Sequence, residues 1–255
     1  MTQPKLKLNK ILKKGRALFL AYDQGLEHGP VDFNDKNVDP EYIINIAKQG
    51  KYTAIILQKG IAAKYQKQIR KAKVPLIIKL NGKTSLVKGD PLSRQLCTVK
   101  EAVKLGASAV GYTIYLGSQH ESIMLQEFEN ILRQAHSHSP PLPVVAWIYP
   151  RGKSIKGKSK KQLMAYSART GLELGADIIK IQYNGNPKDL AWAVKSAGKT
   201  KIVIAGGIKK QDSQLIKQTK EIMNSGCIGL AIGRNIWQHK KPMEITGKIK
   251  KVVWK

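Results

Sequence analysis

The chain has 255 residues and a formal charge of +28 at pH 7, because it carries 45 Lys and Arg against 17 Asp and Glu. No apolar stretch approaches the roughly 20 residues that a membrane-spanning helix needs, and two cysteines, Cys97 and Cys227, give neither a disulfide framework nor a metal-ligand spacing. These totals argue against a helical membrane protein and a disulfide scaffold, and they predict one domain over residues 1–255 in a reducing cytoplasm.

The N-terminal segment is basic and is followed by the short apolar run Ala17–Ala21, which ends before Asp23. A secretory signal peptide has a longer apolar region and a cleavage site of small residues, so the likeness to one is superficial. We expect this run to form the first strand.

Eight apolar runs rich in β-branched residues follow one another along the chain, with ends about 30 residues apart, which is the span of one strand–helix unit. The predicted strands are Ala17–Asp23, Tyr52–Leu57, Pro75–Leu80, Ala107–Thr113, Pro143–Tyr149, Asp177–Gln182, Lys201–Ala205 and Ile228–Ile232. Eight such units predict an α/β fold of the (β/α)8 TIM-barrel type. A doubly wound open sheet is the competing fold, but no Gly-x-Gly-x-x-Gly follows the first strand.

The segments between these runs have apolar residues at helical spacing. Two examples are Leu96, Val99, Val103 and Leu105 before Gly106, and Leu163, Tyr166, Ala168 and Leu172 before Gly175. Both glycines are of the kind that ends a helix. The eighth helix is expected within Pro242–Lys255, with its buried face formed by Ile245, Ile249, Val252 and Val253.

Two long connections, Gly25–Pro40 and Pro150–Lys161, leave the first and fifth strands. Long loops in a compact domain are often functional, and the active site of a barrel lies at the carboxyl ends of its strands. We therefore expect both connections to border the active site.

Lys180 interrupts the run Ala176–Ile181, whose other residues are typical of a strand buried on both faces. Burial lowers the pKa of a lysine by up to about 3–5 units, and a neutral lysine is a nucleophile toward carbonyl groups. Lys79 has the same local pattern in Leu76–Leu80, so apolar context alone does not separate the two. The place of Lys180 on the sixth strand, beside the next two strand ends, favours it.

The seventh and eighth strands end in Ala205-Gly206-Gly207 and Ile232-Gly233-Arg234. Barrels often bind phosphate after these two strands, where glycines let backbone N–H groups approach the anion and an arginine adds a charged fork. The alternative is two tight turns with a solvated Arg234. Glycines at both strand ends favour the phosphate site.

Three further side chains lie at strand ends. Tyr149 is a candidate for proton transfer, or it packs under a loop. Asp23 is expected to orient the lysine or act as an acid or base, or else to cap a turn. His28 is expected to bind a phosphate or hydroxyl group, or to cap its loop.

A metal site is not expected. His136 and His138 are predicted in a loop at the far end of the barrel, without a carboxylate or cysteine nearby in sequence.

Five motifs resemble, in matching order from about Leu18 to about Pro242, the archaeal-type class I fructose-bisphosphate aldolases of the DeoC-like Schiff-base family. They are Asp-Gln-Gly-Leu-Glu-His-Gly-Pro at 23–30, Trp-Ile-Tyr-Pro-Arg-Gly at 147–152, Asp-Ile-Ile-Lys at 177–180, Ala-Gly-Gly at 205–207 and Gly-Arg-Asn at 233–235. Gln182-Tyr183-Asn184-Gly185-Asn186 departs from the family, in which Tyr-Thr-Gly is more common, and the high charge is also atypical.

The resemblance implies a role for each matching residue. Lys180 would be the Schiff-base lysine, Tyr149 the proton donor and acceptor, and Asp23 the group that assists carbinolamine steps. The implied binding residues are Gln24, Gly25, His28, Trp147 and Arg151 for substrate, and Gly206, Gly207, Gly233 and Arg234 for phosphate. No metal or cofactor is implied. The family often forms rings of five, sometimes stacked into decamers, so a homo-oligomer is expected.

The implied reaction is reversible cleavage of fructose 1,6-bisphosphate to dihydroxyacetone phosphate and glyceraldehyde 3-phosphate. A sibling such as 2-amino-3,7-dideoxy-D-threo-hept-6-ulosonate synthase shares the lysine and phosphate motifs, although the segment 23–30 favours the glycolytic enzyme. The high charge leaves a polyanion-binding or nucleic-acid-binding barrel as an alternative of another class. Only 7 of the 45 basic residues are arginine, the residue on which base readers depend, so we favour a solvated lysine-rich surface and a sugar-phosphate substrate.

Overall fold

A computed structural model describes residues 8–255 of the chain. Eight parallel strands close into a barrel in the order β1-β10-β9-β8-β7-β6-β3-β2. The barrel strands are β1 Ala17–Ala21, β2 Ala54–Gln58, β3 Leu76–Lys79, β6 Ala107–Leu116, β7 Val144–Pro150, β8 Ile178–Ile181, β9 Lys201–Ala205 and β10 Gly229–Ile232. Each overlaps one predicted strand, which confirms the (β/α)8 barrel. The open sheet is wrong, because β1 pairs with both β2 and β10.

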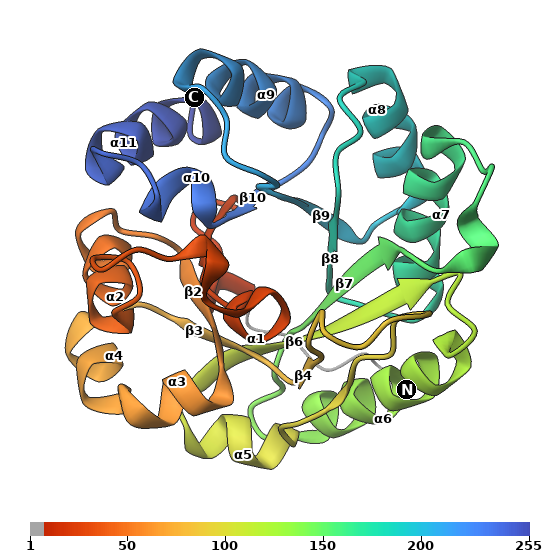
Figure 1. Cartoon of the computed structure of the whole chain (residues 1–255), viewed down its shortest axis with the longest axis horizontal. Helices are drawn as coiled ribbons and strands as arrows, with labels where there is room; N and C mark the ends of the chain where they lie inside the picture. Colours follow the sequence, from red (N-terminus) through yellow and green to blue (C-terminus); the bar gives the residue numbers. More distant parts are fainter. Residues whose placement is uncertain (1–7) are drawn as a thin grey trace.

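The helices form a ring around the strands (Figure 1). The longer ones are α2 Pro40–Gln49, α3 Lys59–Lys64, α4 Gln66–Ala72, α5 Val99–Lys104, α6 Glu121–Ser137, α7 Lys160–Glu173, α8 Pro187–Ser196, α9 Asp212–Asn224 and α11 Pro242–Val253. Short elements are η1 Leu8–Lys10, α1 Gly25–His28, η2 Gly29–Asp32, η3 Lys153–Ile155, α10 Arg234–Trp237 and the hairpin β4 Asn81–Gly82 with β5 Arg94–Gln95. No helix in the described part of the chain is both long and apolar enough to cross a membrane.

Local signals in the sequence set the helix ends. Thr98 and Glu101 form a capping box at the start of α5, so the helix begins after Leu96. Gly106 and Gly175 have positive φ angles just after α5 and α7, as expected for residues that end helices.

The apolar core has two layers. The larger lies between the strands and the helices, and the smaller fills the barrel interior. Much of the interior consists of alanine and β-branched residues, and the large indole of Trp147 also fits there. It fits because β6 carries Gly111, where a Cβ atom would lie 1.5 Å from the Trp147 ring.

Three details of the sequence analysis are wrong. His136 lies in α6 rather than in a loop, and its Nε2 is 3.0 Å from the Asp177 carboxylate. Leu96 precedes α5 instead of lying within it. Val252 of α11 is only partly buried, whereas Ile245, Ile249 and Val253 are buried as expected.

Candidate active site

A pocket opens at the carboxyl ends of the barrel strands. It is lined by Asp23, Gln24, His28, Trp147, Tyr149, Arg151, Lys180, Gly206, Gly207, Gly233 and Arg234, together with Ala21, Glu27, Lys79, Gln182, Ala205 and Ala231. Eleven of the twelve residues predicted for the site are therefore brought together. Gly25 is the exception: it starts α1 and lies against the ring of Phe33.

Two buried lysines and one buried carboxylate occupy the floor of the pocket. Lys180 is 6% exposed, Lys79 is 5% exposed and Asp23 is 7% exposed. The Nζ atom of Lys79 lies 3.3 Å from Oδ2 of Asp23, and no carboxylate within residues 8–255 forms an ion pair with Lys180. The Nζ atom of Lys180 instead lies 4.9 Å from the centroid of the Trp147 ring, its register partner on β7.

The pocket shifts the pKa values of Lys180 and Asp23 for different reasons. Burial lowers the pKa of Lys180 from 10.5 to about 8; the carboxylate of Asp23 opposes this shift and the charge of Lys79 reinforces it. Burial also opposes ionisation of Asp23, but Lys79 and Lys180 outweigh it and hold the pKa of that carboxyl below its usual value. At pH 7 a larger fraction of Lys180 is therefore neutral than would be expected at the ordinary pKa of a lysine.

Tyr149 lies beside a second charged group at the edge of the pocket. Nη1 of Arg151 is 2.6 Å from Oε1 of Glu27, and the hydroxyl of Tyr115 donates to the same oxygen at 3.2 Å. The Arg151 guanidinium lies 5.8 Å from the centroid of the Tyr149 ring. Burial and then the charge of Asp23 raise the pKa of Tyr149 well above its usual value, so its hydroxyl is protonated at neutral pH.

In the loops after β9 and β10, glycines let the backbone pack closely against neighbouring residues. A Cβ atom on Gly206 would lie 2.7 Å from Ile232, and one on Gly233 would lie 2.5 Å from the carbonyl oxygen of Ala21. Gly207 has a φ angle of +69°, which favours glycine.

Backbone N–H groups in these two loops are available to a ligand. Within the described residues, no acceptor is found for the N–H groups of Gly207, Ile208, Lys209, Gly233 and Arg234. Such unpaired N–H groups are suited to an anion.

Asp32 links two predicted phosphate ligands. Its two carboxylate oxygens lie 2.6 Å from Nδ1 of His28 and 3.4 Å from Nη1 of Arg234. Gln24 and Trp147 add two buried side-chain N–H donors that have no partner within the part of the chain that the structure describes. Unpaired buried donors are costly, so these two suit contact with a substrate oxygen.

Three polar or charged lining residues were not assigned to the site from the sequence. Lys79 was considered only as a rival of Lys180, Glu27 lay unassigned within the motif 23–30, and Gln182 lay in the segment that departs from the family. Lys79 was detectable because its β3 pattern matches that of Lys180 on β8. Among the described residues, no three His, Cys, Asp or Glu side chains are grouped as metal ligands would be.

A parallel (β/α)8 barrel with a lysine of lowered pKa beside anion-accepting loops is the architecture of an aldolase that forms a Schiff base. The model of the DeoC/LacD family aldolases matches residues 17–239, and the chain belongs to this family.

Relatives of known name are similar over nearly the whole chain. Fructose-bisphosphate aldolase class 1 of Thermoproteus tenax is 44% identical, over 95% of this chain and 91% of that protein. A solved archaeal fructose-1,6-bisphosphate aldolase, with its catalytic lysine covalently bound to the carbinolamine intermediate of the substrate, has a TM-score of 0.91 and 43% identity and covers 97% of this chain and 98% of its own. A Methanocaldococcus jannaschii protein named fructose-bisphosphate aldolase/6-deoxy-5-ketofructose 1-phosphate synthase is 38% identical, over 91% of this chain and 78% of that protein.

Proposed function

We propose that this chain is a class I, metal-independent fructose-bisphosphate aldolase. It cleaves fructose 1,6-bisphosphate reversibly into dihydroxyacetone phosphate and glyceraldehyde 3-phosphate. The observation that carries the proposal is Lys180, a buried lysine with a pKa near 8 in a pocket that also contains two anion-accepting loops. A neutral amine is the form that attacks a carbonyl carbon.

The reaction begins when neutral Lys180 attacks the C2 carbonyl of the open-chain sugar. Tyr149 gives its proton to the carbinolamine hydroxyl, which leaves as water with the assistance of Asp23, and the resulting iminium accepts the electron pair of the C3–C4 bond. The Tyr149 phenolate takes the proton of the C4 hydroxyl as that bond breaks, which leaves an enamine on Lys180. Protonation at C3 and hydrolysis then release dihydroxyacetone phosphate and regenerate the amine.

The high pKa of Tyr149 has a consequence for this series of reaction steps. At rest its hydroxyl is protonated, because burial and the negative charge of Asp23 disfavour the phenolate. The iminium cation on Lys180 adds a nearby positive charge, which favours the phenolate again. The pKa of Tyr149 therefore falls when the Schiff base forms, so the phenolate becomes available at the stage at which the C4 proton has to leave.

The same proposal assigns the binding groups. One phosphate is held by Gly206, Gly207, Gly233 and Arg234 with His28, and the sugar is contacted by Gln24, Trp147 and Arg151, with Gly25 shaping the loop that carries Gln24. The cationic segment 151–161 attracts the second phosphate. Of the phosphate and sugar ligands named individually, all but Gly25 line the pocket, and Arg151 is the one residue of the segment 151–161 that does so.

Borohydride trapping tests the assignment. Protein treated with fructose 1,6-bisphosphate or dihydroxyacetone phosphate and then with borohydride is expected to carry one reduced adduct, located on Lys180 by peptide mass spectrometry. The variant Lys180→Met is the control and is expected to give no adduct and no cleavage. An adduct on Lys79 would refute the assignment.

A second candidate activity is synthesis of 6-deoxy-5-ketofructose 1-phosphate, because the M. jannaschii relative is named for both reactions. This activity and that of the hept-6-ulosonate synthase need the same Schiff-base lysine. Product analysis by mass spectrometry with each aldehyde and ketose donor separates them from cleavage of fructose 1,6-bisphosphate.

We propose in addition that the chain acts as one barrel domain in the cytoplasm and forms a homo-oligomer of five or ten copies. Two features support this proposal: Cys97 and Cys227 are both free thiols, and Tyr166 and Trp192 are exposed along a groove between α7 and α8. Light scattering after size-exclusion chromatography tests it, and a monomer mass would refute it.

A further inference from the structure

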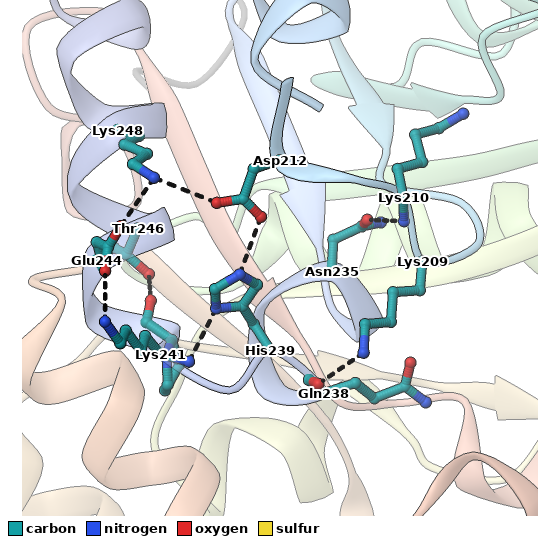
Figure 2. Close-up of polar contacts among 11 residues, drawn as sticks. Lys209, Lys210, Asp212, Asn235, Gln238, His239, Lys241, Glu244, Thr246 and Lys248 are labelled. Carbon is teal, nitrogen blue, oxygen red and sulfur yellow. Dashed lines mark hydrogen bonds and ion pairs between the residues drawn. The ribbon is translucent and has the colours of Figure 1, made fainter. Parts of the chain in front are cut away.

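Asn235 lies directly behind the loop that follows β9. It is on α10, is 2% exposed and forms three hydrogen bonds with that loop. Its Nδ2 donates to the carbonyl oxygens of Gly206 at 3.0 Å and Ile208 at 2.8 Å, and its Oδ1 accepts from the N–H of Lys210 at 2.8 Å. Figure 2 shows the last of these contacts, beside Lys209, whose ammonium donates to the carbonyl of Gln238 at 3.0 Å. One amide therefore holds residues 206–210 at three points.

These bonds determine which way the loop presents its N–H groups. In a planar trans peptide, the C=O of one residue and the N–H of the next point in opposite directions. Because the carbonyls of Gly206 and Ile208 point to Asn235, the N–H groups of Gly207 and Lys209 point away from it. Neither N–H has an acceptor within residues 8–255, so both remain available to an anion.

Asn235 also connects the two loops on which the phosphate site depends. It follows Gly233 and Arg234 directly in sequence, while its side chain is bonded to the loop that contains Gly206 and Gly207. One buried side chain therefore links the two loops. The loop after β9 has two other attachments: the N–H of Gly206 donates to Ala231 at 2.9 Å, and the ammonium of Lys209 donates to the carbonyl of Gln238 at 3.0 Å.

We propose that Asn235 is a positioning residue that preorganises the phosphate-binding loop 206–210 without itself contacting the phosphate. The inference rests on the proposed function for the identity of the anion. Preorganised donors bind an anion without the cost of ordering the loop when the ligand arrives. Asparagine is needed because the loop presents two acceptors and one donor; aspartate retains the acceptor for Lys210 but loses both donors and adds a negative charge near the site.

A purely structural role for Asn235 has a different signature. Helix α10 has further attachments: Nε1 of Trp237 donates to Ala21 at 3.1 Å, and His239, two residues after the end of the helix, contacts Asp212 at 2.9 Å (Figure 2). Loss of the Asn235 amide should therefore leave the helix in place while loop 206–210 is released. A structural role alone would lower stability without changing the affinity for phosphate.

The test compares Asn235→Ala and Asn235→Asp with Asn37→Ala. Asn37 is a matched control because it is buried and its Nδ2 also bonds to α10, at the Trp237 carbonyl, but it does not line the pocket. Both Asn235 variants are expected to raise the inhibition constant of inorganic phosphate and the KM for fructose 1,6-bisphosphate at least tenfold, with Asp the stronger. The Asn37 variant is expected to change both values less than twofold. Borohydride trapping at saturating substrate should still label Lys180.

A measurement on the unaltered protein keeps the inference testable if the Asn235 variants do not fold. Inorganic phosphate is expected to slow hydrogen exchange at the N–H groups of Gly207 and Lys209 and to leave the Asn235 side-chain amide bonded to the loop. Folded Asn235 variants with wild-type phosphate inhibition, or no protection of these two N–H groups, would overturn the inference. Absence of both cleavage and borohydride trapping in the wild type would instead overturn the proposed function, so the two failures are distinguishable.

Discussion

Replacing Lys180 with methionine is expected to abolish catalysis and at the same time to stabilise the fold at neutral pH. The lysine is 6% exposed, and burial lowers its pKa from 10.5 to about 8. This difference corresponds to about 3 kcal/mol at 25 °C that the folded protein loses by holding the protonated amine. Methionine has a similar length and no charge, so the variant avoids this loss.

The sign of the effect fixes its pH dependence. Between pH 8 and pH 10.5 the unfolded chain binds a proton at Lys180 that the folded protein does not bind. The stability of the wild type therefore rises with pH through this window relative to the variant. The advantage of Lys180→Met is expected to be about 3 kcal/mol at pH 7, about 1 kcal/mol at pH 10 and absent at higher pH.

Guanidinium unfolding at pH 7 and pH 10 measures this difference, because both proteins share every other titrating group. The slope of unfolding free energy against denaturant has to agree between them for the comparison to hold. An advantage that does not change with pH would mean that packing of methionine, not relief of the buried charge, causes the stabilisation. A variant less stable than the wild type at pH 7 would refute the depressed pKa of Lys180.

Three other outcomes are expected. Lys79→Met removes a charge that lowers the pKa of Lys180, so the pKa of Lys180 should rise in this variant. Borohydride trapping at pH 7 should then slow about tenfold for each unit by which the pKa rises, and it should recover at high pH. Equal trapping rates in the variant and the wild type would contradict this coupling. Gly111→Ala places a Cβ 1.5 Å from the Trp147 ring, so it should shift the indole fluorescence and destabilise the fold by about 1–3 kcal/mol, whereas Gly247→Ala in the open part of α11 should stabilise it by about 1 kcal/mol. EDTA should leave cleavage of fructose 1,6-bisphosphate unchanged, and loss of activity on chelation would refute a metal-independent reaction.

The fold was predictable because its signals are local and repeat. Each strand of a parallel barrel is buried on both faces, so it appears in the sequence as a short β-branched run, and a helix of regular spacing follows. The pocket was predictable for a related reason: all eight strands point the same way, so residues at their carboxyl ends meet on one face whatever the details of packing. Gly206 and Gly233 illustrate this, because they lie far apart in sequence and line one pocket.

Contacts across the barrel were not predictable in the same way. Asp23 follows β1 and Lys79 ends β3, and their ion pair depends on the register of β1, β2 and β3 rather than on any local pattern. The bonds from Asn235 to loop 206–210 depend likewise on how α10 packs after β10. Neither register nor helix packing is encoded in a short motif, so Lys79 and Asn235 remained without a role in the sequence analysis.

The geometry of the pocket supports Lys180, rather than the similar Lys79, as the proposed nucleophile. The carboxylate of Asp23 lies 3.3 Å from Lys79, while Lys180 lies against the face of Trp147. An ion pair favours the charged form of a lysine, and an apolar environment disfavours it. The arrangement therefore leaves Lys180 as the amine that loses its proton near pH 8, with the charge of Lys79 lowering that pKa further. Burial is the main cause of the lowered pKa of Lys180, and the ion pair of Asp23 with Lys79 leaves the Lys180 amine without a carboxylate partner among the described residues.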